Sequence, residues 1–169
     1  PDGKLTPEEI APTLVFEQVT DEEPLEDVSS PGLDILLVDD SPNTRMLFSL
    51  YLKGTKHRIT EAHNGREGLD AFGGKNFDVV FMDLEMPLMD GYQATRIIRA
   101  MEADAGKKPT PIVAVTGYTL PEARHECFYA GCSEFLAKPF SKNALLSTLE
   151  AIEQSVRKGA CCLCATNSA

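Results

Sequence analysis

The sequence predicts a doubly wound α/β domain, in which helices cover both faces of a parallel β-sheet. From residue 34 onward, short apolar runs of strand length alternate five times with stretches of helical spacing. Three of these runs are apolar throughout, as strands buried on both faces are. Capping residues and glycines stand at the borders of the helical stretches. A βα unit repeated five times is typical of this fold class.

The predicted strands are short and evenly spread along the chain. The runs ILLV, VVFM and IVAV are wholly apolar, whereas RITEA and EFLA contain polar residues. In chain order, the five predicted strands occupy residues 35–38, 58–62, 79–82, 112–115 and 134–137.

A helix is predicted after each strand. The five helices are expected at residues 42–53, 65–73, 91–104, 120–130 and 142–157. Ser41 followed by Pro42 predicts an N-cap with proline in the first turn, and Asn64 and Ser141 occupy similar positions. The glycines expected to end helices are Gly54, Gly106 and Gly131.

Residues 1–33 differ from the rest of the chain in composition. They carry eight of the ten net negative charges and five prolines, with few apolar residues. Such a segment cannot offset the entropy cost of its own ordering, so we expect an acidic, flexible linker. We expect the domain to span residues 34–157 and a C-terminal tail to span 158–169.

Charge and hydropathy exclude several classes of function. Without the acidic leader the chain is close to neutral, so it lacks the basic stripe that binds nucleic acid or an anionic membrane surface. No apolar run is long enough to cross a membrane, and no signal peptide is recognisable. We therefore expect a cytoplasmic location. Because the chain begins with Pro1 instead of methionine, we expect a piece of a longer protein.

Polar side chains gather directly after the predicted strands. Asp39 and Asp40 follow the first strand, Asp83 the third, Thr116 the fourth and Lys138 the fifth. The carboxyl ends of parallel strands meet at one edge, so these side chains should converge there. Singly, an acid after a strand often only caps the next helix. Three acids together repel one another unless a cation joins them, and oxygen-only ligands favour a hard ion such as Mg²⁺ or Mn²⁺.

Phosphoryl chemistry would give each of these residues a task. An aspartate can act as a nucleophile and form an acyl phosphate when the phosphoryl oxygens are neutralised. Lys138 would supply a positive charge and Thr116 a hydroxyl donor, so catalysis would rest on positioning and electrostatics. The alternative is that Lys138 is a solvated surface lysine and Thr116 a turn residue.

Four motifs, LLVDDS, VVFMDLEMPLMDG, VAVTG and FLAKPF, resemble in order and separation the receiver domains of two-component signalling. The resemblance covers about residues 33–157. It implies a flavodoxin-like (βα)5 three-layer sandwich with the parallel strand order 2-1-3-4-5. It also implies phosphoryl transfer from a histidine kinase or histidine phosphotransfer domain, in a phosphorelay. The segment TRIIRAMEA looks most like receivers of hybrid sensor histidine kinases. Dimerisation through the last helices is left open.

The resemblance assigns the acidic residues individually. It implies that Asp83 is the phosphoacceptor and shares a Mg²⁺ ion with Asp40, which binds directly, and Asp39, which binds mainly through water. The backbone carbonyl of Glu85 would be a further ligand. The Glu85 side chain is either an ordinary loop acid or a group that affects the lifetime of the phosphoryl group.

The remaining roles concern the switch. By resemblance, Thr116 and Phe135 are switch residues, Lys138 contacts the phosphoryl group, and the peptide bond before Pro139 is cis. Phe135 could equally be an ordinary core aromatic. Gly117 stands where alanine is frequent in the family, which should leave the acceptor more accessible to water.

Several other functions use similar residues or the same topology. An aspartate-nucleophile phosphatase of the haloacid dehalogenase type needs a DxD pair on its first strand, whereas this chain has adjacent acids there. A flavodoxin-like electron carrier needs a phosphate-binding loop where this chain has DDSPN. A docking module that works without phosphorylation, or a stand-alone regulator, remains a further alternative.

Overall fold

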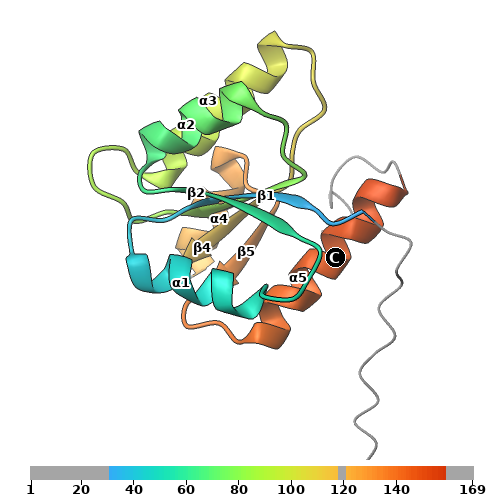
Figure 1. The fold of residues 1–169 in the computed structure, drawn as a ribbon. Helices are drawn as coiled ribbons and strands as arrows, with labels where there is room; N and C mark the ends of the chain where they lie inside the picture. Colours follow the sequence, from blue (N-terminus) through green and yellow to red (C-terminus); the bar gives the residue numbers. More distant parts are fainter. Residues whose placement is uncertain (1–30, 118–120, 159–169) are drawn as a thin grey trace, which may run out of the picture. The chain divides into compact units, whose positions relative to one another are not determined.

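A single five-stranded parallel sheet forms the centre of the domain. The computed structural model describes residues 31–117 and 121–158. The strand order is β2-β1-β3-β4-β5, which confirms the predicted fold class and order (Figure 1). The strands are β1 (Asp34–Val38), β2 (Arg58–Ala62), β3 (Val79–Asp83), β4 (Ile112–Thr116) and β5 (Glu134–Ala137).

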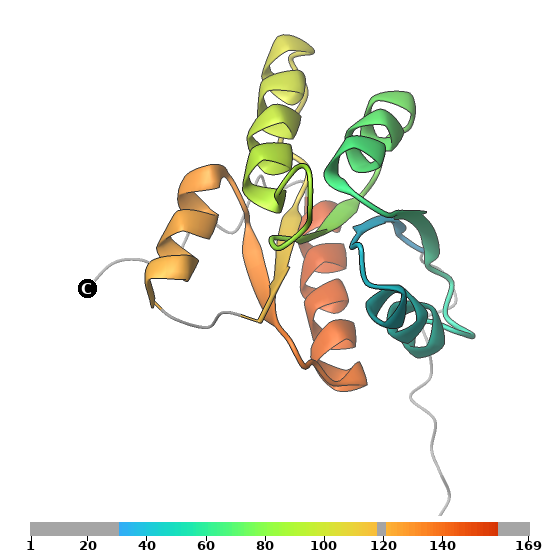
Figure 2. The same ribbon diagram turned by 90° about the vertical axis from the view of Figure 1, so that its left-hand side faces the viewer.

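Within the described residues, five helices complete a three-layer arrangement, and α1 and α5 lie on the face of the sheet opposite to α2, α3 and α4 (Figures 1 and 2). The helices are α1 (Pro42–Tyr51), α2 (Gly65–Gly74), α3 (Gly91–Asp104), α4 (Pro121–Ala130) and α5 (Lys142–Arg157). None of the described helices combines the length and the apolar character that crossing a membrane requires.

The core has two halves because successive strand residues point to opposite faces. Ile35 and Leu37 of β1 pack with Phe48 of α1, whereas Leu36 and Val38 belong to the half covered by α2, α3 and α4. These residues of β1 are completely buried. Burying one such side chain contributes about 1.5–3 kcal/mol to stability, so the apolar strands fix the order of the layers.

Side-chain caps define where the helices begin. Ser41, Asn64 and Ser141 accept hydrogen bonds from main-chain N–H groups three residues later, which confirms the predicted caps. Asp90 caps α3 in the same way by accepting from Gln93, and this cap was not predicted. Each cap contributes about 1 kcal/mol. The caps therefore fix the starts of α1, α2, α3 and α5 immediately after the loops at the carboxyl edge.

Helix α1 ends at Tyr51, two residues earlier than predicted. The N–H of Lys53 donates to the Leu50 carbonyl at 3.3 Å, a tighter turn than an α-helix makes. The chain then passes through Gly54, whose φ is 85°. The other described elements agree with the predicted bounds within one residue.

Two predicted segments fall mainly outside the described residues. They are the linker before residue 31 and the tail after residue 158.

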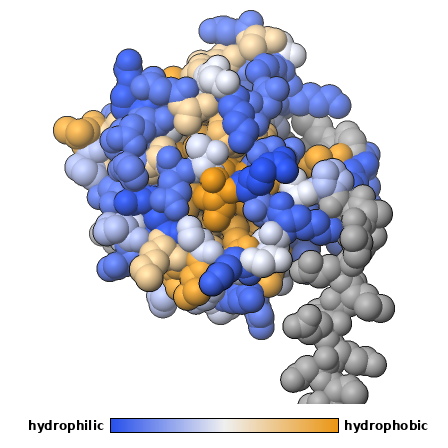
Figure 3. Space-filling model, in the orientation of Figure 1, coloured by the Kyte–Doolittle hydropathy of each residue, from blue (hydrophilic) through white to orange (hydrophobic). Residues whose placement is uncertain are grey.

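The face of the molecule in Figure 3 is mostly hydrophilic, with a smaller apolar patch near its centre (Figure 3).

Candidate functional site

Three carboxylates meet at the carboxyl edge of the sheet. Asp39 follows β1 and is completely buried, Asp83 ends β3 and is 4% exposed, and Asp40 is exposed. One carboxylate oxygen from each residue lies within 4.8 Å of the others. The structure therefore brings together all three acids that the sequence places after strands.

Lys138 bridges two of these acids from the end of β5. Its Nζ lies 2.9 Å from Asp39 Oδ2 and 2.8 Å from Asp83 Oδ2. The Lys138 main-chain N–H donates to the Thr116 carbonyl at 2.7 Å, which joins the ends of β5 and β4. The Lys138–Pro139 peptide bond is cis. The carboxyl ends of β1, β3, β4 and β5 thus supply one connected polar cluster.

The loop after β1 fixes the orientation of Asp39. The Ser41 N–H donates to Asp39 Oδ1 at 2.8 Å. The Arg45 guanidinium donates to the Asp39 carbonyl at 2.8 Å and lies 3.3 Å from Glu61. Sequence reasoning missed Arg45; its place one turn after the Ser41 cap was the available signal. These contacts leave Oδ2 of Asp39 directed at Lys138.

The loop after β3 holds Asp83 in a similar way. The Glu85 N–H donates to Asp83 Oδ1 at 3.0 Å, and the Glu85 side chain is exposed. Gly91 begins α3 against this loop, where an added Cβ would lie 2.1 Å from the Asp83 carbonyl oxygen. Only glycine permits this approach, so Gly91 lets the backbone of the loop close behind Asp83.

The charges of the cluster do not balance. Three carboxylates and one ammonium group give a formal charge of −2. Burial is the largest cause that raises the pKa of Asp39, and Lys138 opposes it. Burial would lower the pKa of Lys138, but its bonds to Asp83 and Asp39 outweigh this effect and the pKa is raised. The oxygen-only donors and the charge of −2 suit one hard divalent cation.

The other two predicted switch residues, Thr116 and Phe135, lie on β4 and β5. Thr116 ends β4 and is buried at the same edge as Lys138. Phe135 lies within β5 and is half-buried, with the Arg124 guanidinium carbon 4.1 Å from its ring centroid. No sequence signal identified Arg124, because a cation above an aromatic ring depends on the packing of two elements.

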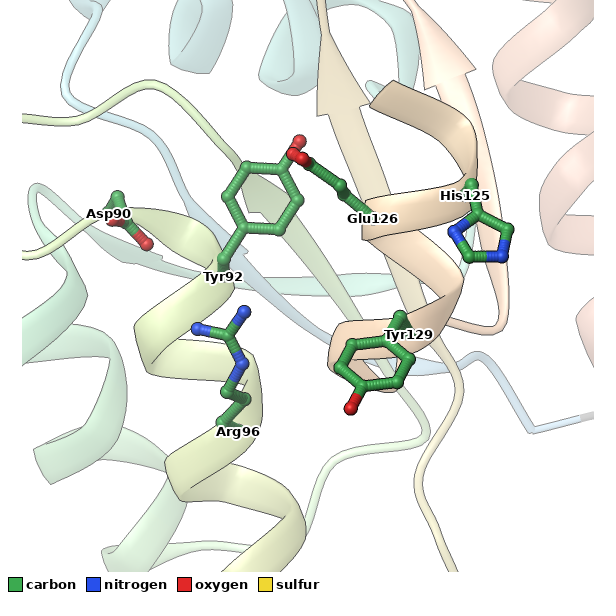
Figure 4. Close-up of a pocket in the computed structure, with 6 residues that line it drawn as sticks. All are labelled: Asp90, Tyr92, Arg96, His125, Glu126 and Tyr129. Carbon is green, nitrogen blue, oxygen red and sulfur yellow. The ribbon is translucent and has the colours of Figure 1, made fainter. Parts of the chain in front are cut away.

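A shallow pocket of about 470 Å³ lies between α3 and α4, and none of the three clustered acids lines it (Figure 4). Its walls consist of Asp90, Tyr92, Arg96, His125, Glu126 and Tyr129. Its lining carries charges of both signs, and its side chains from α4 are exposed. These features do not indicate which class of ligand the pocket would bind.

A family model described as the response regulator receiver domain matches residues 35–150. The chain belongs to the response regulator receiver domain family. This membership confirms the resemblance drawn from the four motifs.

Relatives of this receiver domain are parts of much longer proteins. The sensor histidine kinase GacS of Pseudomonas protegens is 35% identical over 123 residues, which are 73% of this chain and 13% of that protein. The sensory/regulatory protein RpfC of Xanthomonas campestris is 34% identical over 127 residues, 75% of this chain and 17% of that protein. The chain thus spans less than a fifth of these relatives.

A solved structure adds a comparison at the level of the site. The receiver domain of sensor histidine kinase PA1611 from Pseudomonas aeruginosa has a TM-score of 0.65 and 34% identity. The match covers 72% of this chain and 98% of that one. That structure is described with a magnesium ion coordinated in its active site cleft.

Proposed function

We propose that this receiver accepts a phosphoryl group on Asp83 from a phosphohistidine in a Mg²⁺-dependent reaction. The observation that carries the proposal is the Lys138 ammonium group between Asp39 and Asp83, in a cluster of three carboxylates. A structural ion pair needs only one acid, so the surplus acids require another positive group.

The transfer exchanges one bond to phosphorus for another. Asp83 Oδ2 attacks the phosphorus atom, the P–N bond of phosphohistidine breaks, and the imidazole nitrogen keeps the electron pair and takes a proton. Oδ1 of Asp83 is held by the Glu85 N–H at 3.0 Å, which leaves Oδ2 beside Lys138 at 2.8 Å. Lys138 can then neutralise the phosphoryl oxygens as negative charge gathers there.

The acids would hold the cation. Asp40 and Asp83 would bind it directly, Asp39 mainly through water, and the Glu85 carbonyl would be a further ligand. When bound, Mg²⁺ or Mn²⁺ supplies neutralisation of the phosphoryl oxygens. Support comes from the formal charge of −2 and from the absence of nitrogen or sulfur donors among the clustered residues.

The acquired charge would act on Thr116 and Phe135. Thr116 is joined through its carbonyl to Lys138, and we expect its hydroxyl to donate to a phosphoryl group that Lys138 holds. If Thr116 moves toward that group, space opens toward Phe135, whose ring now contacts Arg124 of α4. A change at Phe135 would therefore alter the surface of α4 and β5 that a protein partner meets.

Labelling with a small acyl phosphate tests this function. Intact mass should rise by one phosphoryl group with Mg²⁺ and remain unchanged with a chelator. Borohydride reduction should then convert residue 83, and no other aspartate, to homoserine. Continuous phosphate release at a constant rate would indicate the phosphatase alternative, and labelling at another residue would contradict the assignment of Asp83.

The proposal extends to the setting of the domain. Because its relatives are sensor histidine kinases, we place this receiver within a hybrid kinase on the cytoplasmic side, with a kinase or histidine phosphotransfer domain as donor.

We further propose residues 34–157 as the functional unit, with a linker before and a tail after it. A fragment of residues 34–157 should accept a phosphoryl group from such a donor as fast as the full chain. A much slower fragment would contradict these boundaries. Sedimentation of the labelled and unlabelled chain decides whether the chain dimerises at all, which dimerisation through the last helices requires.

A further inference from the structure

Two buried thiols lie together where α4 meets β5. Cys127 is in the last turn of α4 and is 1% exposed, and Cys132 precedes β5 and is 6% exposed. Both are free cysteines. The receiver function described above uses neither thiol.

The end of α4 forces the two cysteines into contact. Gly131 has a φ of 109°, and the Cys132 N–H donates to the Cys127 carbonyl at 3.1 Å. This is the helix ending in which the side chains at these two positions meet. With standard bond lengths, that hydrogen bond keeps the two Cα atoms within about 7 Å, the upper limit for a disulfide. The two side chains are close enough for each thiol to shift the pKa of the other.

The surroundings distinguish the two sulfur atoms. The Thr95 hydroxyl lies 4.0 Å from Cys132 Sγ, and the Arg99 guanidinium binds the neighbouring Gly131 carbonyl at 2.8 and 2.9 Å. The neighbouring Cys127 thiol lowers the pKa of the Cys132 thiol despite burial. Cys132, together with burial, raises the pKa of Cys127. Cys132 is therefore the sulfur that ionises first, and it is also the more exposed of the two.

We propose that Cys127 and Cys132 form a redox site that a peroxide oxidises to a disulfide, fastening α4 to β5. The Cys132 thiolate attacks one peroxide oxygen, the O–O bond breaks, and a sulfenic acid and water form once a proton is taken up. The Cys127 sulfur then attacks the Cys132 sulfur and expels a second water. Two thiols are oxidised and hydrogen peroxide is reduced to two waters. A small thiol reverses the reaction by exchange.

The cross-link would act on the elements that carry the Phe135 contact. Arg124 lies one turn before Cys127 on α4, and Phe135 lies three residues after Cys132 on β5. A bond between the cysteines would therefore restrain α4 directly beside this contact. Amide hydrogen exchange in α4 should slow in the oxidised protein.

Alkylation and mass measurement of the full chain test the proposal. The background variant C161S/C162S/C164S leaves only Cys127 and Cys132 of the five cysteines. Reduced protein, alkylated after denaturation, should gain two alkyl groups. Peroxide-treated protein should gain none and weigh two hydrogen atoms less, and a small thiol should restore both alkylation sites.

The matched variant Cys127→Ser on the same background should retain Cys132 and give a sulfenic acid without an internal disulfide. The parent chain, digested without substitutions, gives the same answer from the peptide that contains both cysteines. Two alkylated thiols after the peroxide dose that oxidises the Cys127→Ser variant would overturn the proposal. Unchanged exchange in α4 of the disulfide form would overturn the claim that the bond fastens this helix.

Discussion

The two ends of strand β1 carry the same residue type in opposite electrostatic surroundings. At the amino end, Asp34 accepts hydrogen bonds from Arg58 at 2.6 Å and Lys75 at 2.9 Å, and these cations lower its pKa. At the carboxyl end, Asp39 is completely buried, its pKa is raised chiefly by burial, and Lys138 is its cationic partner. The pKa values of two aspartates five residues apart are thus shifted in opposite directions.

The difference lies in the number of charges that each end gathers. Asp78 joins the amino end by accepting from the Asp34 N–H at 2.8 Å, so two acids meet two cations there. Asp40 and Asp83 join the carboxyl end, where three acids meet one lysine. A cluster with equal numbers of acids and cations stabilises the packing of neighbouring strands. A surplus of partly buried negative charge is instead typical of a functional site, where it can bind a cation.

The largest expected effect is on the rate of phosphoryl incorporation, and it distinguishes the lysine at the carboxyl end of β1 from the lysine at the amino end. Lys138→Ala removes the positive charge beside Asp83 and should slow phosphoryl incorporation by about 10²–10³-fold, the usual loss for one transition-state donor. Lys75→Ala removes the equivalent partner of Asp34 and should leave the rate unchanged. Initial rates with a small acyl phosphate measure both. Equal rates in the two variants would contradict the claim that only the carboxyl end of β1 takes part in phosphoryl transfer.

Divalent cations should stabilise the folded protein through the carboxyl end only. At a Mg²⁺ concentration about 100 times its dissociation constant, the free energy of unfolding should rise by about 2.7 kcal/mol. Asp40→Asn should lose most of this gain, because the exposed Asp40 carboxylate would be a ligand of the ion and makes no contact that the fold needs. Asp34→Asn should retain it. Urea unfolding with and without Mg²⁺ distinguishes these outcomes, and loss of the gain in Asp34→Asn would contradict the account.

The balanced end should contribute a smaller, pH-dependent stability. Asp34→Asn should lower the free energy of unfolding by up to about 1 kcal/mol at neutral pH. Because the folded-state pKa of Asp34 lies below its ordinary value of 3.8, this contribution is present above that pH. It is lost as the pH falls through the folded-state pKa. Urea unfolding of both proteins at a series of acidic pH values should show the difference shrinking. A constant difference would assign it to something other than the carboxylate charge.

The smallest expected effect concerns the lifetime of the phosphoryl group. An added Cβ at residue 117 meets no atom within 4 Å, so Gly117→Ala should fold normally. The methyl group would screen the acceptor from water and lengthen the half-life of the acyl phosphate about threefold, equivalent to about 0.6 kcal/mol. Glu85→Gln, which alters an exposed side chain near the same opening, is the companion variant. An unchanged half-life in both would leave neither residue a role in hydrolysis.

The fold could be predicted because its signals are local. Continuous apolar runs identified β1, β3 and β4, and capping residues marked three helix starts. The cluster could also be predicted, although the bonds of Lys138 span 99 and 55 residues. Parallel strands bring their carboxyl ends to one edge, so a local pattern was enough.

Contacts that depend on packing between elements could not be predicted. The Arg124 contact with Phe135 depends on how α4 lies against β5. The thiol contact of Cys127 and Cys132 depends on the conformation of Gly131. Both thiols are buried and free, and no sequence pattern indicated that they lie together.

The most direct test compares the two acids that flank β3. Asp78 precedes the strand and belongs to the balanced end, whereas Asp83 ends it and belongs to the acidic cluster. Intact mass is measured after treatment with a small acyl phosphate and Mg²⁺. Asp78→Asn should gain one phosphoryl group, as the parent chain does, and Asp83→Asn should gain none. An Asp83→Asn variant that gains the same mass as the parent chain would contradict the account.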